Sequence, residues 1–210
     1  MKIPKQYKEG FVDFLGCRID LSHKPFIPRP ETAYWTSLAI KEMGDNAECL
    51  DLFSGSGCIG VSILNAKEKT TCDFAEIDDK CLKQIEKNLK GIDKKRYNII
   101  KSDIFSNVKK RYDYILANPP YVAEDRIAEV GKDVLKFEPH VALFSGPSGM
   151  NAIRIMIKET KDHLKEGGKL ILEFDESQTE EIEDLIKENG YENYELFKDQ
   201  FDQVRFIKIW

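Results

Sequence analysis

A tetrapeptide near the middle of the chain, Asn118-Pro119-Pro120-Tyr121, has the residue types needed to methylate a planar nitrogen. The lone pair of an amide or amino nitrogen is delocalised, so a catalyst must hold that nitrogen in line with the methyl donor and favour the charge that develops on it. The Asn118 side-chain oxygen and the Pro119 carbonyl can accept both N–H hydrogens. The two prolines stiffen the loop and offer no competing N–H donor, while Tyr121 provides a flat face for the acceptor. The tetrapeptide therefore predicts a site that methylates an amide or amino nitrogen.

A glycine loop earlier in the chain could hold the methyl donor. It is the run Asp51-Leu52-Phe53-Ser54-Gly55-Ser56-Gly57, which joins a predicted strand to a predicted helix. Glycines let the backbone pass close to a ligand, and the helix start beyond them has unpaired N–H groups. In a doubly wound sheet this junction lies at the carboxyl edge, where nucleotide-like ligands bind. Because Gly55, Gly57 and Gly60 also fit dinucleotide spacing, the loop alone leaves NAD and S-adenosylmethionine open.

Carboxylates follow the next two predicted strands. Glu76 ends the second of the core strands and can accept hydrogen bonds from both ribose hydroxyls of a nucleotide. We favour it over Asp78 and Asp79, whose positions are typical of helix N-caps. Asp103 follows the third strand, where its side chain could accept from an adenine amino group while the Ile104 backbone reads the ring edge.

The elements that must position these residues follow an alternating pattern. Strands separated by helix-length segments predict right-handed βαβ units, and hence a doubly wound, mostly parallel α/β sheet. The short link between the last two strands predicts an antiparallel pair, and residues 11–21 predict a small β-hairpin. The predicted strands are 49–53, 71–76, 97–101, 112–117, 169–174, 194–197 and 205–209, and the predicted helices are about 31–43, 58–66, 79–89, 150–164 and 180–188.

Composition limits the classes of protein that remain. At 210 residues, with 41% hydrophobic and 33% charged residues, the chain suits one globular α/β domain. It has neither the roughly 20-residue apolar run of a membrane helix nor a signal-peptide segment, so we expect a cytoplasmic protein without membrane contact. Its net charge of −5 disfavours a domain that grips nucleic acid by itself. Its five single cysteines are predicted to be reduced structural thiols, and its three scattered histidines predict no metal site.

Together these residues resemble the class I methyltransferases and, within them, the release-factor glutamine methyltransferase family. The family's F-x-P-R-P-E-T segment is present as residues 26–32, and its D-x-F and N-P-P-Y motifs as residues 103–105 and 118–121. Its F-E-P-R-x-A-L motif is similar to residues 137–143, with His140 in place of arginine, and residues 172–174 with Gln178 and 199–205 resemble its C-terminal signatures loosely. Its G-T-G-S-G loop corresponds to residues 53–57, where Phe53 replaces the first glycine.

The resemblance implies a fold, a cofactor and an acceptor. The fold is a Rossmann-like sheet of seven strands with an antiparallel last strand, in a methyltransferase domain over residues 31–210, preceded by a hairpin and cofactor-covering segment over residues 1–30. The cofactor is S-adenosylmethionine, which leaves as S-adenosylhomocysteine. The acceptor is a protein glutamine, the GGQ glutamine of a peptide chain release factor. The implied catalytic residues are Asn118, Pro119, Pro120 and Tyr121; the implied cofactor-binding residues are Phe26, Arg29, Thr32, Asp51, Phe53, Ser54, Gly55, Ser56, Gly57, Glu76, Asp103, Ile104 and Asn118.

Two alternatives to a glutamine methyltransferase remain at this stage. Bacterial family members begin with a helical domain that helps dock the release factor, and no counterpart precedes residue 11. We therefore expect docking through another surface or partner, or a different substrate. A DNA or RNA methyltransferase acting on an exocyclic amino group such as adenine N6 would need a flipped or single-stranded base, and neither a target-recognition domain nor a basic surface is evident. The third class is a non-catalytic scaffold, which remains an alternative because Phe53 departs from the family's glycine loop.

Overall fold

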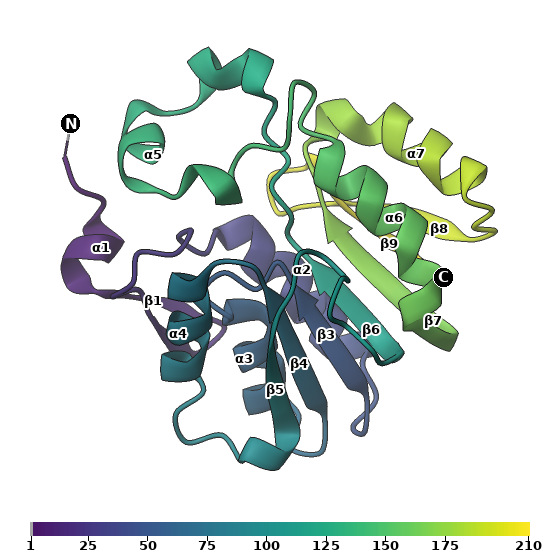
Figure 1. Ribbon diagram of the computed structural model, residues 1–210, viewed down its shortest axis with the longest axis horizontal. Helices are drawn as coiled ribbons and strands as arrows, with labels where there is room; N and C mark the ends of the chain where they lie inside the picture. Colours follow the sequence, from purple (N-terminus) through teal and green to yellow (C-terminus); the bar gives the residue numbers. More distant parts are fainter. Residues whose placement is uncertain (1) are drawn as a thin grey trace.

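The computed structural model describes residues 2–210 and has a mixed β-sheet at its centre. Within these residues, seven strands form this sheet in the order β5-β4-β3-β6-β7-β9-β8, as Figure 1 shows in part. Strand β9 pairs antiparallel with both of its neighbours, β7 and β8, and the other neighbouring pairs are parallel. The strands are β3 (Glu48–Leu52), β4 (Thr71–Glu76), β5 (Tyr97–Lys101), β6 (Tyr112–Ala117), β7 (Leu164–Glu173), β8 (Tyr194–Lys198) and β9 (Val204–Ile209). The predicted doubly wound sheet with an antiparallel last strand is confirmed.

A two-stranded antiparallel hairpin precedes the sheet, as the sequence predicts. It consists of β1 (Phe11–Phe14) and β2 (Cys17–Asp20), and a short helix, α1 (Lys5–Glu9), lies before it. Phe14 and Ile19 of the hairpin are buried in the same apolar cluster as the helices that follow. The hairpin therefore shares an apolar core with the next three helices of the chain.

Helices cover both faces of the sheet (Figure 1). The longer ones are α2 (Pro30–Glu42), α3 (Cys58–Ala66), α4 (Asp79–Asn88), α6 (Asn151–His163) and α7 (Thr179–Glu188). Shorter turns are α5 (Lys132–Phe137), η1 (Lys94–Arg96), η2 (Glu124–Glu129), η3 (His140–Ala142) and η4 (Glu176–Gln178). In residues 2–210 no helix has the length and apolarity that crossing a membrane requires.

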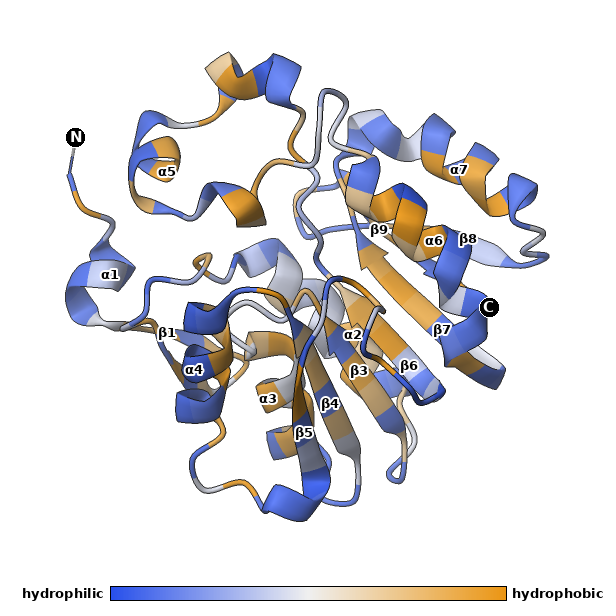
Figure 2. Ribbon diagram, in the orientation of Figure 1, coloured by the Kyte–Doolittle hydropathy of each residue, from blue (hydrophilic) through white to orange (hydrophobic). Residues whose placement is uncertain are grey.

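Two apolar cores result from the alternation of side chains along the strands. On β3, Cys49 belongs to a core with the hairpin, α2, α3 and α4, whereas Leu50 belongs to a second core with α6 and α7. Figure 2 shows the strands β3, β6 and β7 as largely apolar ribbons between helices with hydrophilic outer faces. Burial on both faces explains why these strands are apolar runs in the sequence.

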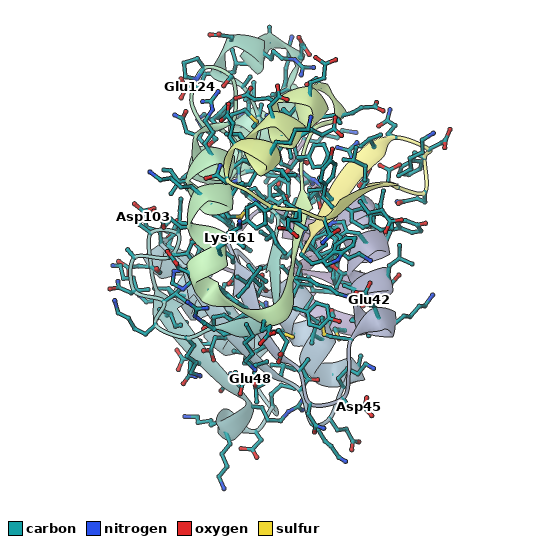
Figure 3. All side chains as sticks on the ribbon, turned by 90° about the vertical axis from the view of Figure 1, so that its right-hand side faces the viewer. Glu42, Asp45, Glu48, Asp103, Glu124 and Lys161 are labelled. Atoms are coloured by element: carbon teal, nitrogen blue, oxygen red, sulfur yellow. The ribbon has the colours of Figure 1, made fainter. Side chains whose placement is uncertain are left out.

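The carboxyl edge of the parallel strands faces the segment 122–149. Figure 3 labels Glu48, the first residue of β3, towards the lower end of the molecule and Glu124, the first residue of η2, at the upper end. The segment 122–149, which contains none of the predicted strands or helices, includes η2, α5 and η3 and forms a cap above this edge (Figure 1).

Two boundaries differ from the predicted ones. Helix α2 begins at Pro30 rather than at Glu31 or Thr32, since proline suits the first helical turn, where no intrahelical N–H bond is lost. Strand β7 begins at Leu164 rather than at Lys169, because Leu164 already pairs with Tyr112. The pairing register between β6 and β7 breaks between Leu164 and Lys169, where Gly167 has a φ of 72°.

Candidate functional site

The glycine loop between β3 and α3 is held in shape from below by Asp51. This side chain is fully buried, and its Oδ2 accepts a hydrogen bond of 2.9 Å from the Gly60 N–H in the first turn of α3. Oδ1 has no hydrogen-bond partner among the described residues. Burial raises the pKa of Asp51 well above its usual range, against the effect of the Gly60 N–H. Asp51 therefore fixes where α3 begins and leaves an unpaired acceptor beneath the loop.

Glu76, at the end of β4, braces the same loop from the side. One carboxylate oxygen accepts from the Gly55 N–H at 2.7 Å, and the other accepts from the N–H groups of Ile77 and Asp78. Burial raises the pKa of Glu76, and the backbone donors oppose that rise. Asp78 caps α4 by accepting from the Lys80 N–H. Its N-cap role is thus confirmed.

Asp103 and Ile104 follow β5 in a tight turn. The Ser102 hydroxyl donates to the Ile104 carbonyl, and the Asp103 N–H donates to the Ser106 hydroxyl. Asp103 is exposed and lies at the left-hand margin of the molecule in Figure 3. Ile104 has a φ of 49°, a left-handed conformation that turns the chain back after the strand.

The Asn118-Pro119-Pro120-Tyr121 loop follows β6 and is anchored through its first and last side chains. The Asn118 amide nitrogen donates to the Thr32 hydroxyl at 3.1 Å. The Tyr121 hydroxyl donates to the buried Glu173 carboxylate at 3.2 Å. Burial raises the pKa of Tyr121, and the charge of Glu173 raises it further. Tyr121 is therefore a neutral hydrogen-bond donor whose ring forms part of a wall.

A cavity of about 290 Å³ collects most of the predicted site residues. They come from the N-terminal segment, the glycine loop and the ends of β4, β5 and β6, as expected for the carboxyl edge of such a sheet. The predicted residues that line it are Phe26, Thr32, Phe53, Ser54, Gly55, Ser56, Glu76, Asp103, Ile104, Asn118, Pro119, Pro120 and Tyr121.

Three predicted cofactor-binding residues do not line this cavity: Arg29, Asp51 and Gly57. Asp51 lies beneath the loop, and Gly57 is the N-cap of α3 with a φ of 77°. A Cβ atom at Gly57 would approach the Ile85 side chain to 3.3 Å, so this glycine allows α3 and α4 to pack closely. Both residues shape the loop from outside the cavity.

Arg29 instead closes a clasp between two walls of the cavity. Its guanidinium lies 2.6 Å from the Glu138 carboxylate, whose other oxygen accepts from the Ile27 N–H at 3.0 Å. The guanidinium also stacks over the Phe26 ring, 4.3 Å from its centroid. The clasp joins the wall that contains Phe26 to the wall that begins at Pro139.

Sequence reasoning missed the wall that the cap segment contributes. Its members line the cavity and lie between residues 122 and 149; they are Val122, Pro139, Val141, Ala142, Leu143 and Phe144. The resemblance of the F-E-P-H-V-A-L segment to a family motif was the one sequence feature that could have indicated this wall. Pro28, Cys58, Ile59, Ile77, Cys81 and Ala152 also belong to the apolar lining.

The donor and acceptor set of this cavity fits S-adenosylmethionine. The carboxylates of Glu76 and Asp103 can accept from ribose hydroxyls and an adenine amino group, and the side chains of Phe53, Ile77 and Ile104 offer apolar surface to a purine. Beneath the loop, the buried Oδ1 of Asp51 is a further oxygen atom without a hydrogen-bond partner among the described residues. Arginine and lysine side chains are absent from the described lining, which does not suit a polyphosphate.

Comparisons with known proteins agree with this geometry. Residues 35–140 match the Methyltransferase small domain family. The release factor glutamine methyltransferase of Streptococcus pneumoniae is 32% identical over 208 residues, which cover 98% of this chain and 74% of that protein.

Solved structures show the same fold at low sequence identity. The hMettl16 catalytic domain, solved in complex with an RNA hairpin, has a TM-score of 0.72 and 15% identity, covering 93% of this chain and 76% of that one. A methyltransferase named SMU.776, complexed with SAH, has a TM-score of 0.65 and 13% identity, covering 92% of this chain and 53% of that one. Both likenesses concern the fold.

Proposed function

The chain belongs to the release factor glutamine methyltransferase family of class I methyltransferases, and on that premise we propose that it methylates the side-chain amide nitrogen of a protein glutamine. The protein substrate is a peptide chain release factor, and the acceptor is its GGQ glutamine. A single observation carries the proposal: Asn118 to Tyr121 line the same cavity as the glycine loop and Glu76. The nitrogen acceptor and the methyl donor can therefore meet there.

Separate groups of residues bind the cofactor and orient the acceptor. S-adenosylmethionine, when bound, supplies an electrophilic methyl group on a sulfonium. Glu76, Asp103 and the loop from Phe53 to Ser56 hold its nucleoside. Phe26 and Thr32 cover it from the N-terminal side.

Asn118 and Pro119 orient the acceptor. The Asn118 side-chain oxygen and the Pro119 carbonyl accept the two amide hydrogens of the glutamine, which places its nitrogen in line with the methyl group. These acceptors also stabilise the positive charge that develops on nitrogen as the new C–N bond forms. The proton can leave to water after transfer, so the site needs no dedicated base.

Protein and not nucleic acid is the favoured acceptor class for two reasons. The net charge is −5, which gives little of the counterion-release energy that nucleic-acid binding uses. A relative that aligns with 98% of this chain is named a release factor glutamine methyltransferase. Translation termination takes place in the cytoplasm, so the proposal places the protein there.

A methyl-transfer assay tests the proposal. Purified protein is incubated with tritiated S-adenosylmethionine and, in separate reactions, with release factor, tRNA, rRNA or DNA. We expect label in release factor and none in a release factor whose GGQ glutamine is changed to alanine. Label in nucleic acid alone would contradict the glutamine assignment.

The Asn118→Ala variant tests the catalytic assignment. We expect transfer to fall by at least about a hundredfold, as for loss of one preorganised polar contact to a transition state, with cofactor affinity within about tenfold. Asn46→Ala is the matched control, since Asn46 is exposed in the turn before β3, at the opposite edge of the sheet. Wild-type turnover in Asn118→Ala would refute the assignment.

A further inference from the structure

A buried carboxylate at the end of β7 lies behind the Asn118 loop and has no role in the reaction as described so far. Glu173 is 1% exposed. Its Oε2 accepts from the Thr32 hydroxyl at 2.7 Å and from the Trp35 indole N–H at 2.6 Å, and its Oε1 accepts from the Tyr121 hydroxyl at 3.2 Å. Thr32 in turn is the partner of the Asn118 amide. One buried carboxyl group thus connects α2, β7 and, directly or through Thr32, both ends of the N-P-P-Y loop.

In this series of hydrogen bonds, the number of protons that each group can donate determines which group is the donor and which is the acceptor. The Trp35 indole nitrogen is only a donor, so Oε2 of Glu173 must remain an acceptor. A proton on the carboxyl group would therefore lie on Oε1, towards Tyr121. The single Thr32 hydroxyl proton is used on Oε2, and the Thr32 oxygen has only lone pairs left for Asn118. The group of Asn118 that faces Thr32 at 3.1 Å must be the NH₂.

The orientation of the Asn118 amide follows from this polarity. With its nitrogen held by Thr32, its oxygen points away from Thr32 and is available to accept an N–H hydrogen. The opposite orientation would place NH₂ towards the acceptor nitrogen, where two donors would face each other, and would leave the amide oxygen against the Thr32 lone pairs. Each of these contacts is repulsive.

We propose that Thr32 and Glu173 are positioning residues: their hydrogen-bond relay locks the Asn118 amide with its oxygen towards the acceptor nitrogen. The inference rests on the proposed function, because it specifies how that site distinguishes an N–H₂ acceptor from other groups. Trp35 sets the polarity of the relay, and Tyr121 holds the second oxygen of Glu173. Neither Glu173 nor Trp35 lines the cavity, so both act through their partners.

Three single variants test the relay. Thr32→Val keeps the shape of Thr32 and removes its hydroxyl; we expect kcat to fall about tenfold to a hundredfold, with the affinity for S-adenosylhomocysteine within about threefold. Thr32→Ser restores the hydroxyl and is expected to recover kcat to within about fivefold of wild type. In Glu173→Gln the new amide can keep its oxygen towards Trp35 and Thr32 and its NH₂ towards the Tyr121 oxygen. Its kcat should therefore also stay within about fivefold.

These variants separate hydrogen-bond polarity from charge and from packing. If Glu173→Gln loses as much activity as Thr32→Val, catalysis depends on a negative charge at position 173, and the proposed hydrogen-bond relay is refuted. If Thr32→Ser stays as impaired as Thr32→Val while both melt within a few degrees of wild type, the hydroxyl is not the active feature.

A double-mutant cycle asks whether Thr32 acts through Asn118. Asn118→Asp has no NH₂ to give to Thr32, so adding Thr32→Val to it should reduce its residual kcat by less than about twofold. An equal loss in both backgrounds would show that Thr32 acts independently of Asn118, and would overturn the proposal.

An observation that needs no substrate keeps this inference distinct from the proposed function. With ¹⁵N-asparagine labelling, the Asn118 side-chain NH₂ resonance can be assigned by its loss in Asn118→Ala. We expect its hydrogen exchange with solvent to be slow in wild type and Thr32→Ser, and at least about tenfold faster in Thr32→Val. Unchanged exchange in Thr32→Val would refute the relay, whereas a wild type that labels no release factor would refute only the acceptor assignment.

Discussion

Phe53 occupies the position at which the release-factor glutamine methyltransferase family has the first glycine of its loop. The backbone conformation of Phe53 explains why glycine suits this position. Its φ is 59°, in the left-handed region, which costs a residue with a Cβ atom about 1–2 kcal/mol. The ring contributes a wall of the cavity and packs against the second apolar core. The loop thus keeps its glycine-like path although its first residue is aromatic.

At position 53 we expect a glycine variant to be more stable than an alanine variant, the reverse of the order expected within a helix. We expect Phe53→Gly to be more stable than Phe53→Ala by about 1 kcal/mol, because glycine alone adopts this conformation without a Cβ penalty. Urea denaturation of the two variants measures the difference. Tyr34, in the middle of α2, is the control, since Tyr34→Gly should be less stable than Tyr34→Ala by about 1 kcal/mol. The same order at both positions would contradict the strain at Phe53.

At the scale of elements, the clasp between Arg29 and Glu138 decides how the cavity is enclosed. It connects the segment before α2 to the turn after α5, which are 109 residues apart. The Glu138 side chain is 2% exposed and the Arg29 side chain 29%. The Glu138 carboxylate is thus shielded from water, and loss of the pair would release two walls of the cavity together.

Removal of the clasp should weaken cofactor binding without blocking the chemistry. We expect Glu138→Ala to lower the affinity for S-adenosylhomocysteine by about tenfold, mainly through faster dissociation. Calorimetry and stopped-flow fluorescence measure the two quantities. Glu129→Ala, which removes the exposed partner of Arg126, should leave both unchanged. An unaltered dissociation rate in Glu138→Ala would mean that the clasp does not hold the cavity closed.

At the scale of the whole molecule, the helix α3 packs tightly against the strand β4 at Gly60. A Cβ atom there would come within 2.4 Å of the Phe74 ring and 2.9 Å of the Cys72 sulfur. Gly60 also donates to Asp51, so the depth of α3 against β4 sets the position of the glycine loop. Core packing and site geometry are therefore linked at one residue.

A methyl group at Gly60 should affect stability and binding together. We expect Gly60→Ala to lower the free energy of unfolding by about 1–3 kcal/mol through overpacking, and to weaken cofactor binding because α3 must move away from β4. Gly44→Ala is the control, since a Cβ atom at Gly44 meets nothing within 4 Å and the residue has no positive φ. Denaturation and calorimetry on both variants test this. Equal stability of the two would show that the helix layer adapts freely.

Much of the fold and the cavity could be predicted from the sequence because local patterns determine them. Apolar runs separated by helix-length segments specify the order of strands and helices, and parallel strands necessarily bring their carboxyl ends to one edge. Glu76, Asn118 and the glycine loop therefore had to meet. The N-cap of α4 at Asp78 and the final antiparallel strand were equally local inferences.

Only the tertiary structure decided which of these residues face the ligand and what holds them there. Arg29, Asp51 and Gly57 belong to the predicted segments but lie outside the cavity lining. Glu173 accepts a hydrogen bond from Thr32, which is 141 residues away in the sequence. The pairing of Arg29 with Glu138 and the cap over residues 122–149 depend on contacts between distant segments. The periodicity of apolar residues indicates which face of a helix or strand is buried. The direction of a hydrogen bond, in contrast, depends on every group that folding brings within about 3 Å.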